Sequence, residues 1–193
     1  MTIRSHIRNT TIIAGTAVAV FLAILAFQQV LRLSGNFHTV VAGQFYRSSQ
    51  LSTAALEGYV HRYGLKTIVN LRGAEPNRKW YQDEKHLADS LGLTMIDFGM
   101  SATKPITRDR AAALVAVLKA AQKPILVHCL DGADRTGLVS VIYASQVAGE
   151  DEETSERQLT PLYGHFGIPL VSPTFAMDSS WEDLETFFGI AGS

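Results

Sequence analysis

The pattern of apolar and polar residues divides the chain into an uncharged N-terminal stretch and a part where short apolar runs alternate with helical spacing. Residues 9–31 carry no charged side chain. As a helix this stretch would extend roughly 34 Å, enough to cross a hydrocarbon core of about 30 Å. We therefore expect a transmembrane anchor over residues 9–33, preceded by a short basic N-terminus at 1–8.

The apolar stretch has two other interpretations. A cleaved signal peptide is disfavoured because the stretch is long and the following QQVLRLSG offers no clean small-x-small cleavage site. A buried helix of a soluble protein is disfavoured by hydrophobicity around the whole circumference. Arg4 and Arg8 precede the span and Arg32 follows it, which favours a cytoplasmic N-terminus. We predict a single-pass membrane protein with an extracytoplasmic, periplasmic-type domain; the cytoplasmic face is the alternative.

The remaining residues, 34–193, are predicted to form one domain that follows a short tether at 33–38. Caps at Ser52, Gly64 and Thr107 help to place the helix ends, and Ser179 or Ser180 is expected to cap the last helix. The patterns predict strands at 40–46, 65–71, 93–98 and 125–128, and helices at 53–63, 79–91, 108–122, 136–148 and 181–188. This alternation predicts an α/β fold: a mostly parallel central sheet with helices on both faces.

Composition removes several classes of function. The net charge of −1 gives no basic footprint for nucleic acid. A single cysteine permits neither an internal disulfide framework nor a thiolate zinc cluster. The six histidines have no metal-ligand spacing, so we expect no metal and no cofactor.

The strongest chemical signal is the stretch 125–137, ILVHCLDGADRTG. A short apolar strand leads into a tight loop and then into the start of a helix. Such a loop directs backbone N–H groups and the positive end of a helix dipole at one point, which suits a phosphate dianion. The same field favours the thiolate form of Cys129. Arg135 can bind two phosphate oxygens through its planar guanidinium.

The string HCLDGADRTG resembles the His-Cys-x5-Arg-Thr/Ser-Gly signature of the protein tyrosine and dual-specificity phosphatase superfamily. The pieces FYRSSQLS, IVNLRG and LGLTMIDFGMSA look like bacterial dual-specificity-type enzymes, so the likeness covers about residues 37–137. The resemblance implies that Cys129 forms a phosphocysteine, that His128 orients the loop and that Thr136 hydrogen-bonds the departing thiolate. It also implies a phosphate-binding loop made of Leu130, Asp131, Gly132, Ala133, Asp134 and Arg135.

The general acid has two candidates. Asp97 lies 32 residues before Cys129, near the family's usual spacing. Asp131 matches a loop acid of myotubularin-like phosphoinositide phosphatases, while Asp134 would fix the loop or meet the substrate. Both loop carboxylates have a structural alternative, because short acids accept backbone N–H bonds in turns. Two carboxylates beside a phosphate site repel a dianion, so some compensating donor is expected.

The leading hypothesis is phosphomonoester hydrolysis through a phosphocysteine at a membrane. The substrate would be a phosphotyrosine or phosphoserine/threonine protein, or a phospholipid head group such as phosphatidylglycerophosphate or a phosphoinositide. The alternatives are a silent module that binds phospho-ligands and a sulfur-transfer enzyme with a similar cysteine loop. Arsenate reduction is disfavoured, since it usually requires further cysteines.

Overall fold

A five-stranded sheet forms the centre of the domain in this computed structural model, which describes residues 3–190 and side chains from residue 12 onward. The strands are β1 (His38–Val41), β2 (Phe45–Ser48), β3 (Thr67–Asn70), β4 (Thr94–Asp97) and β5 (Ile125–His128), in the order β1-β2-β5-β3-β4. All neighbours are parallel except β1 and β2. The α/β prediction with a mostly parallel sheet is confirmed.

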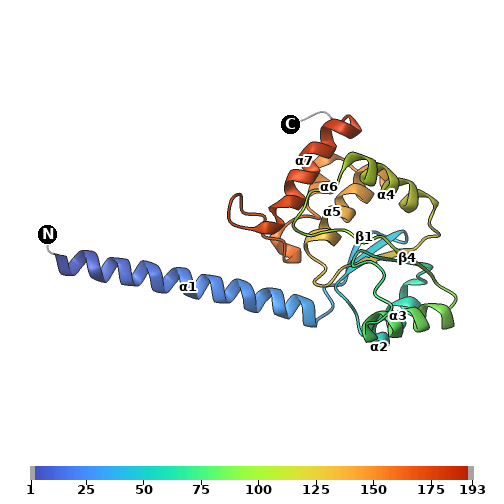
Figure 1. Cartoon of the computed structure of the whole chain (residues 1–193), viewed down its shortest axis with the longest axis horizontal. Coiled ribbons are helices and arrows are strands. Elements are labelled where there is room, and N and C mark those ends of the chain that lie inside the picture. The colour runs from blue at the N-terminus through green and yellow to red at the C-terminus, as the bar shows by residue number, and fades with distance from the viewer. Residues whose placement is uncertain (1–2, 191–193) are drawn as a thin grey trace.

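Helices cover both faces of the sheet (Figure 1). On one side lie α2 (Thr53–Tyr63) and α3 (Lys79–Ser90), and on the other lie α4 (Arg108–Ala120), α5 (Asp134–Tyr143), α6 (Glu152–Glu156) and α7 (Ala176–Phe188). A π-helical segment, Ala144–Ala148, extends α5, and short 3-10 turns occupy Pro161–Tyr163 and Pro173–Phe175.

The three inner strands are buried along their whole length, as strands of a covered parallel sheet should be. Alternate strand residues pack into two hydrophobic cores. Ile68 and Leu126 face the side of α2 and α3, whereas Val69 and Val127 face the side of α5 and α7. This double burial fixes the register of β5, and so the position at which the chain leaves the sheet at Cys129.

The predicted helix caps are present. The Ser52 side chain accepts a hydrogen bond from Ala55 N at 3.3 Å, and Gly64 ends α2 in the left-handed region at φ 64°. Thr107 accepts from Arg110 N at 3.4 Å at the start of α4.

Two local predictions are wrong. The single strand expected at 40–46 is a hairpin, because the chain turns at Gly43 with φ 72° and pairs β1 with β2. The last helix begins at Ala176, not after Ser179 or Ser180. The Ser180 hydroxyl instead donates back to Ala176 O at 2.6 Å and accepts from Ile106 N at 3.1 Å, a packing role inside α7.

The N-terminal helix α1 (Ile3–Leu33) extends away from the domain (Figure 1). Its segment Ile12–Leu33 has a mean hydropathy of 2.0 and none of it is buried. By length and composition this segment can cross a membrane, which agrees with the expected anchor; the helix begins earlier than residue 9 and continues to Leu33.

The expected tether at 33–38 is wrong. Asn36 is only 2% exposed, and its Nδ2 donates to Asp131 O at 3.0 Å and to Tyr163 O at 2.9 Å. Gln28 Nε2, on α1 itself, donates to Gly164 O at 3.1 Å. A buried amide must find such partners, and here they lie in the domain. The end of α1 is therefore fixed against the domain.

Candidate active site

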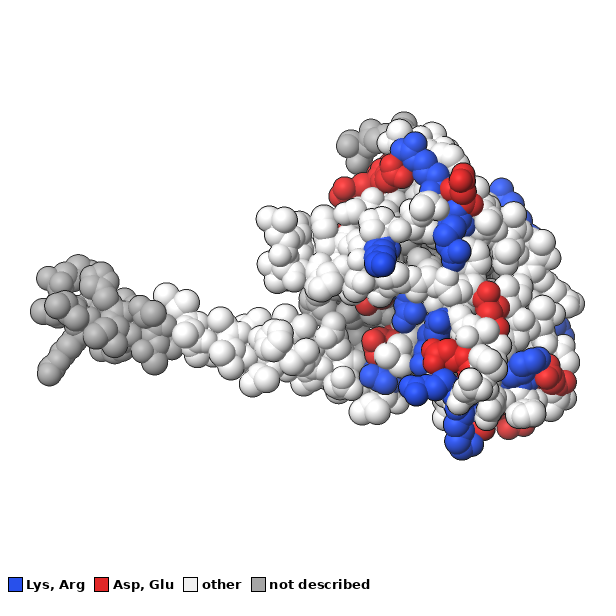
Figure 2. All heavy atoms as spheres, in the orientation of Figure 1, with Lys and Arg blue, Asp and Glu red and all other residues white. Residues whose placement is uncertain are grey.

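The loop 129–135 leaves the carboxyl end of β5 and enters α5 (Figure 1). The last residues of four parallel strands lie in register at this edge, with His128 paired to Ser48 and Asn70, and Asn70 paired to Asp97. Open α/β sheets bind ligands at this edge. Figure 2 shows that several of the basic side chains of this face lie around a hollow in its middle.

The path of the loop depends on Gly132 and on a buried arginine beneath it. Gly132 has φ 70°, and a Cβ there would lie 2.6 Å from the backbone of Ser48 and Ser49. Arg47, which is completely buried at the end of β2, donates from Nη2 to Gly132 O at 2.9 Å and from Nη1 to Gln158 O at 2.5 Å. The guanidinium thus ties the loop to the segment after α6.

Arg47 also places a positive charge under the nucleophile candidate. Burial lowers the pKa of Arg47 to about 10, while the charges of Tyr163 and Cys129 act in the opposite direction. The guanidinium therefore stays charged at neutral pH. Arg47 is not predicted from the sequence, where its only signal is its place inside FYRSSQLS.

Cys129 is 3% exposed at the base of the loop, and His128 links it to α3. His128 Nδ1 lies 3.4 Å from Cys129 O, and Nε2 lies 2.7 Å from Glu84 Oε1. Burial alone would raise the pKa of Glu84, but the His128 contact outweighs it, aided by a 2.6 Å bond from Gln50 Nε2, and the pKa is lowered. Sequence reasoning missed Glu84 and Gln50, which lie on distant segments.

Arg72, just after β3, places another guanidinium beside the loop. It donates to Gln50 Oε1 at 3.1 Å and stacks over the Trp80 ring at 3.5 Å. Burial lowers the pKa of Arg72, and Arg135 lowers it further, whereas Cys129 is among the negative groups that raise it. Arg72 thus shares the electrostatic environment of Arg135 and Cys129.

Arg135 and Thr136 carry buried polar atoms that find no hydrogen-bond partner among the described residues. Arg135 Nη1 donates to Leu71 O at 3.1 Å and Met100 O at 3.3 Å, while its Nε is unpartnered. Thr136 Oγ1 is likewise buried and has no hydrogen-bond partner among the described residues. Buried polar groups rarely stay unpaired without a role. These two fit donors to a phosphoryl group and to a cysteine sulfur.

Asp97 occupies the exposed end of β4, two strands away from His128. Both of its carboxylate oxygens accept hydrogen bonds: Oδ1 from Asn70 Nδ2 at 2.7 Å and Oδ2 from the Tyr81 hydroxyl at 2.5 Å. The bond to Asp97 is the main cause that raises the pKa of Tyr81 to about 12. Asp97 is therefore held at the edge of the site.

The two loop carboxylates each have a basic partner. Asp131 Oδ1 lies 3.4 Å from Arg32 Nε at the end of α1. Asp134 Oδ1 lies 2.7 Å from His165 Nδ1, whose Nε2 lies 2.9 Å from Asp178 Oδ2. Burial would lower the pKa of His165, but the two carboxylates outweigh it and the pKa is raised. Arg32 and His165 are thus the partners of the two loop carboxylates, and neither was identified from the sequence.

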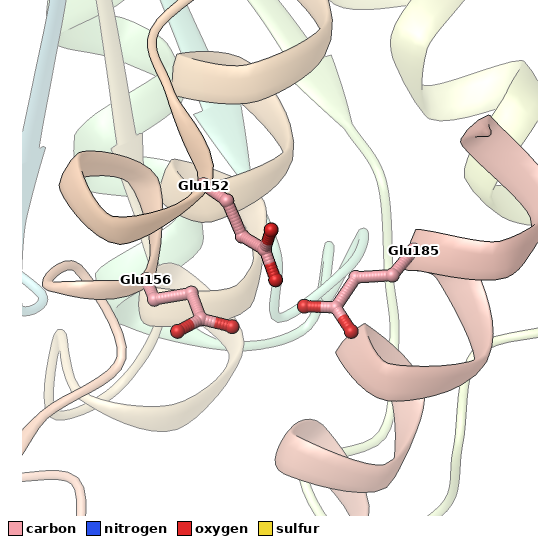
Figure 3. Close-up of side chains that lie close together, drawn as sticks. All are labelled: Glu152, Glu156 and Glu185. Atoms are coloured by element: carbon pink, nitrogen blue, oxygen red, sulfur yellow. The ribbon is translucent and has the colours of Figure 1, made fainter. Parts of the chain in front are cut away.

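A separate acidic cluster lies between α6 and α7 (Figure 3). Carboxylate oxygens of Glu152, Glu156 and Glu185 all lie within 4.8 Å of one another. Burial, then the hydrogen bond and charge of Glu156, raise the pKa of Glu185 to about 7. None of the three residues belongs to the phosphate loop.

Comparison with known families identifies the class of protein. A family model described as "DSP-PTPase phosphatase fused to NAD+ Kinase" matches residues 22–166, most of the chain. The chain belongs to this family. It is a phosphatase of the dual-specificity and protein tyrosine type. No curated relative matches the sequence.

Solved structures agree with this assignment at the level of the fold. TpbA of P. aeruginosa matches with a TM-score of 0.60 and 20% identity over 78% of this chain and 85% of that one. The core catalytic domain of the PP-IP phosphatase Siw14 of S. cerevisiae, in complex with citrate, matches with a TM-score of 0.58 and 21% identity. The match covers 80% of this chain and 93% of that one. Human DUSP28 matches with a TM-score of 0.52 and 17% identity over 79% of this chain and 95% of that one.

Proposed function

We propose that this phosphatase hydrolyses phosphomonoesters through a phosphocysteine on Cys129. The observation that carries the proposal is the pairing of a buried cysteine with the unpartnered donors of Arg135 and Thr136 at one helix start. The Cys129 thiolate attacks phosphorus, and the bond from phosphorus to the ester oxygen breaks. Arg135 and the loop N–H groups hold the phosphoryl oxygens, and Thr136 donates to the sulfur when water later releases phosphate.

Two guanidinium groups contribute positive charge around Cys129. Arg47 and Arg72 both interact electrostatically with Cys129, and the loop opens the helix α5. A positive environment stabilises the attacking form of a cysteine. A catalytically silent binding module would not need this environment, and a sulfur-transfer enzyme would not need the Arg-Thr-Gly helix start.

The test of the nucleophile is vanadate-sensitive hydrolysis of a small aryl phosphate by the full chain in detergent. Cys129→Ser should fold and bind phosphate but lose essentially all turnover, because a hydroxyl is not ionised by this loop. Arg135→Lys should also be severely impaired, since an ammonium cannot replace the bidentate fork. Appreciable turnover by Cys129→Ser would contradict the mechanism.

The general acid is proposed to be Asp97 or Asp131. Asp97 is tied by Asn70 and Tyr81, and Asp131 points to Arg32. Replacing the general acid should slow the hydrolysis of substrates with poor leaving groups far more than that of activated aryl phosphates, whose leaving oxygen needs little protonation. We expect this pattern from Asp97→Asn; the same pattern from Asp131→Asn would place the acid in the loop.

The substrate is proposed to be a phosphomonoester at a membrane surface, with phospholipid head groups favoured over phosphoproteins. The support is the contact between the phosphate loop and the end of α1, through Asp131 and Arg32 and through Asn36 and Asp131. With α1 in a bilayer, the site would be confined beside the head groups, which raises their effective concentration. Phosphatidylglycerophosphate and a phosphotyrosine peptide, tested with the same vesicles, distinguish the two classes.

A further inference from the structure

A projecting loop between His165 and α7 carries the two most exposed large apolar side chains of the described domain. Leu170 is fully exposed, Val171 is 73% exposed and Ile168 is 49% exposed. No charged residue occurs from 166 to 177. Single exposed apolar residues are ordinary on protein surfaces, but a contiguous uncharged group of them marks a contact site.

The conformation of the tip presents these side chains outward. Val171 N donates to Ile168 O at 3.1 Å, which closes a turn with Pro169 and Leu170 at its centre. Leu170 has φ 63°, in the left-handed region that favours glycine. A glycine would adopt this conformation without strain. The leucine instead places an apolar side chain at the most exposed point of the turn.

The base of the loop is anchored. His165 is 1% exposed and binds Asp134 and Asp178. The Ser172 and Thr174 hydroxyls are 2.8 Å apart. The tip is therefore presented by a fixed base, and that base is connected to the phosphate loop through Asp134.

The direction of the loop identifies what it contacts. In Figure 1 the loop projects toward the same side as α1 and reaches back past the end of that helix at Leu33. In Figure 2 the projecting loop and the described side chains of α1 before Arg32 are white, while the other charged side chains of this face lie on the domain. The domain contacts α1 at Gln28 and Arg32, so a bilayer around the more N-terminal part of the helix would have its surface near Gln28.

We infer that the tip 168–171 inserts into the same bilayer that α1 spans. This inference rests on the proposed membrane anchor and adds a further contact to it. Apolar side chains at a membrane surface enter the boundary between head groups and acyl chains, about 5–10 Å deep. With both α1 and the tip in the bilayer, the domain is fixed in orientation, and the cavity lined by Arg32, Asp131 and Tyr163 lies close to the head groups.

The test places a tryptophan in the tip of the full chain and measures its depth. Leu170→Trp is reconstituted in phosphatidylcholine vesicles whose acyl chains are brominated. The matched control is Phe187→Trp, at an exposed apolar position, 42% exposed, near the end of α7 away from α1. We expect a blue shift and bromine quenching for Leu170→Trp beyond the wild-type signal of Trp80 and Trp181, and no added quenching for Phe187→Trp.

Two further readouts separate this inference from the claims on which it rests. If the protein does not float with the vesicles, the anchor and the insertion are overturned together. If the protein floats and Leu170→Trp is no more quenched than Phe187→Trp, the insertion of the tip is overturned and the anchor stands. The exposed tip would then be a contact site for a protein partner. Aryl phosphate hydrolysis, measured on the same samples, tests the phosphatase chemistry independently of quenching.

Discussion

Replacing Gly132 by alanine tests whether the phosphate loop depends on its close contact with the end of β2. The added Cβ would lie 2.6 Å from the backbone of Ser48 and Ser49. Ordinary van der Waals contact begins at 3.4 Å, so the loop and the strand must separate by roughly 0.8 Å. The left-handed φ of 70° adds about 1–2 kcal/mol of local strain.

A displacement near 1 Å in a catalytic constellation costs about 10²-fold, or roughly 2.7 kcal/mol of transition-state stabilisation. We therefore expect Gly132→Ala to lower kcat/KM for an aryl phosphate by about two orders of magnitude. The matched control is Gly64→Ala, which has φ 64° but nothing within 4 Å of its Cβ. That variant should lose a similar small amount of stability and keep its activity.

The assay compares kcat/KM and thermal unfolding for both variants in detergent. Equal activity in Gly132→Ala and Gly64→Ala would refute the reasoning, because the loop would then tolerate displacement. A loss of activity in both would show that backbone strain alone, and not contact with β2, is responsible.

The remaining predictions concern the charged partners. Glu84→Gln should destabilise the protein by about 1.5–3 kcal/mol at neutral pH, because it removes the buried carboxylate that contacts His128 Nε2 and accepts from Gln50 Nε2. The pKa of Glu84 is lowered in the folded state, so this contribution is lost as the pH falls through the folded-state pKa. In denaturant unfolding, the difference in free energy of unfolding between the wild type and the variant should therefore disappear in acid. Glu185→Gln should show the opposite dependence of stability on pH. Its carboxyl has a raised pKa of about 7 against an ordinary 4.5, so the wild type loses stability as the pH rises between these values. Above pH 7 the variant should have the higher Tm.

The sequence predicted the parts of the fold that depend on local patterns. Apolar runs located β3, β4 and β5, and caps at Ser52 and Thr107 located the starts of α2 and α4. The hairpin at Gly43 was missed because the apolar run continues through it, and a single glycine does not distinguish a bulge from a turn.

The candidate site was predicted only where its residues are adjacent in the chain. The stretch from His128 to Thr136 forms one loop at one helix start. Its supporting side chains come from elsewhere: Arg47, Arg72, Glu84 and His165 reach the loop through the fold. An arginine in a strand or a glutamate in an amphipathic helix has no local feature that distinguishes it from a surface charge. Such residues could be found only once the strand order was known.

The most direct test of the central claim is to trap the intermediate. The full chain is mixed with excess aryl phosphate, quenched in acid within the first turnovers, digested and analysed by mass spectrometry. The account predicts one added phosphoryl group on Cys129, absent in Cys129→Ser and absent when the enzyme is treated with vanadate beforehand. Phosphate found on His128 or another residue, or steady turnover with no phosphorylated enzyme and undiminished in Cys129→Ser, would contradict it.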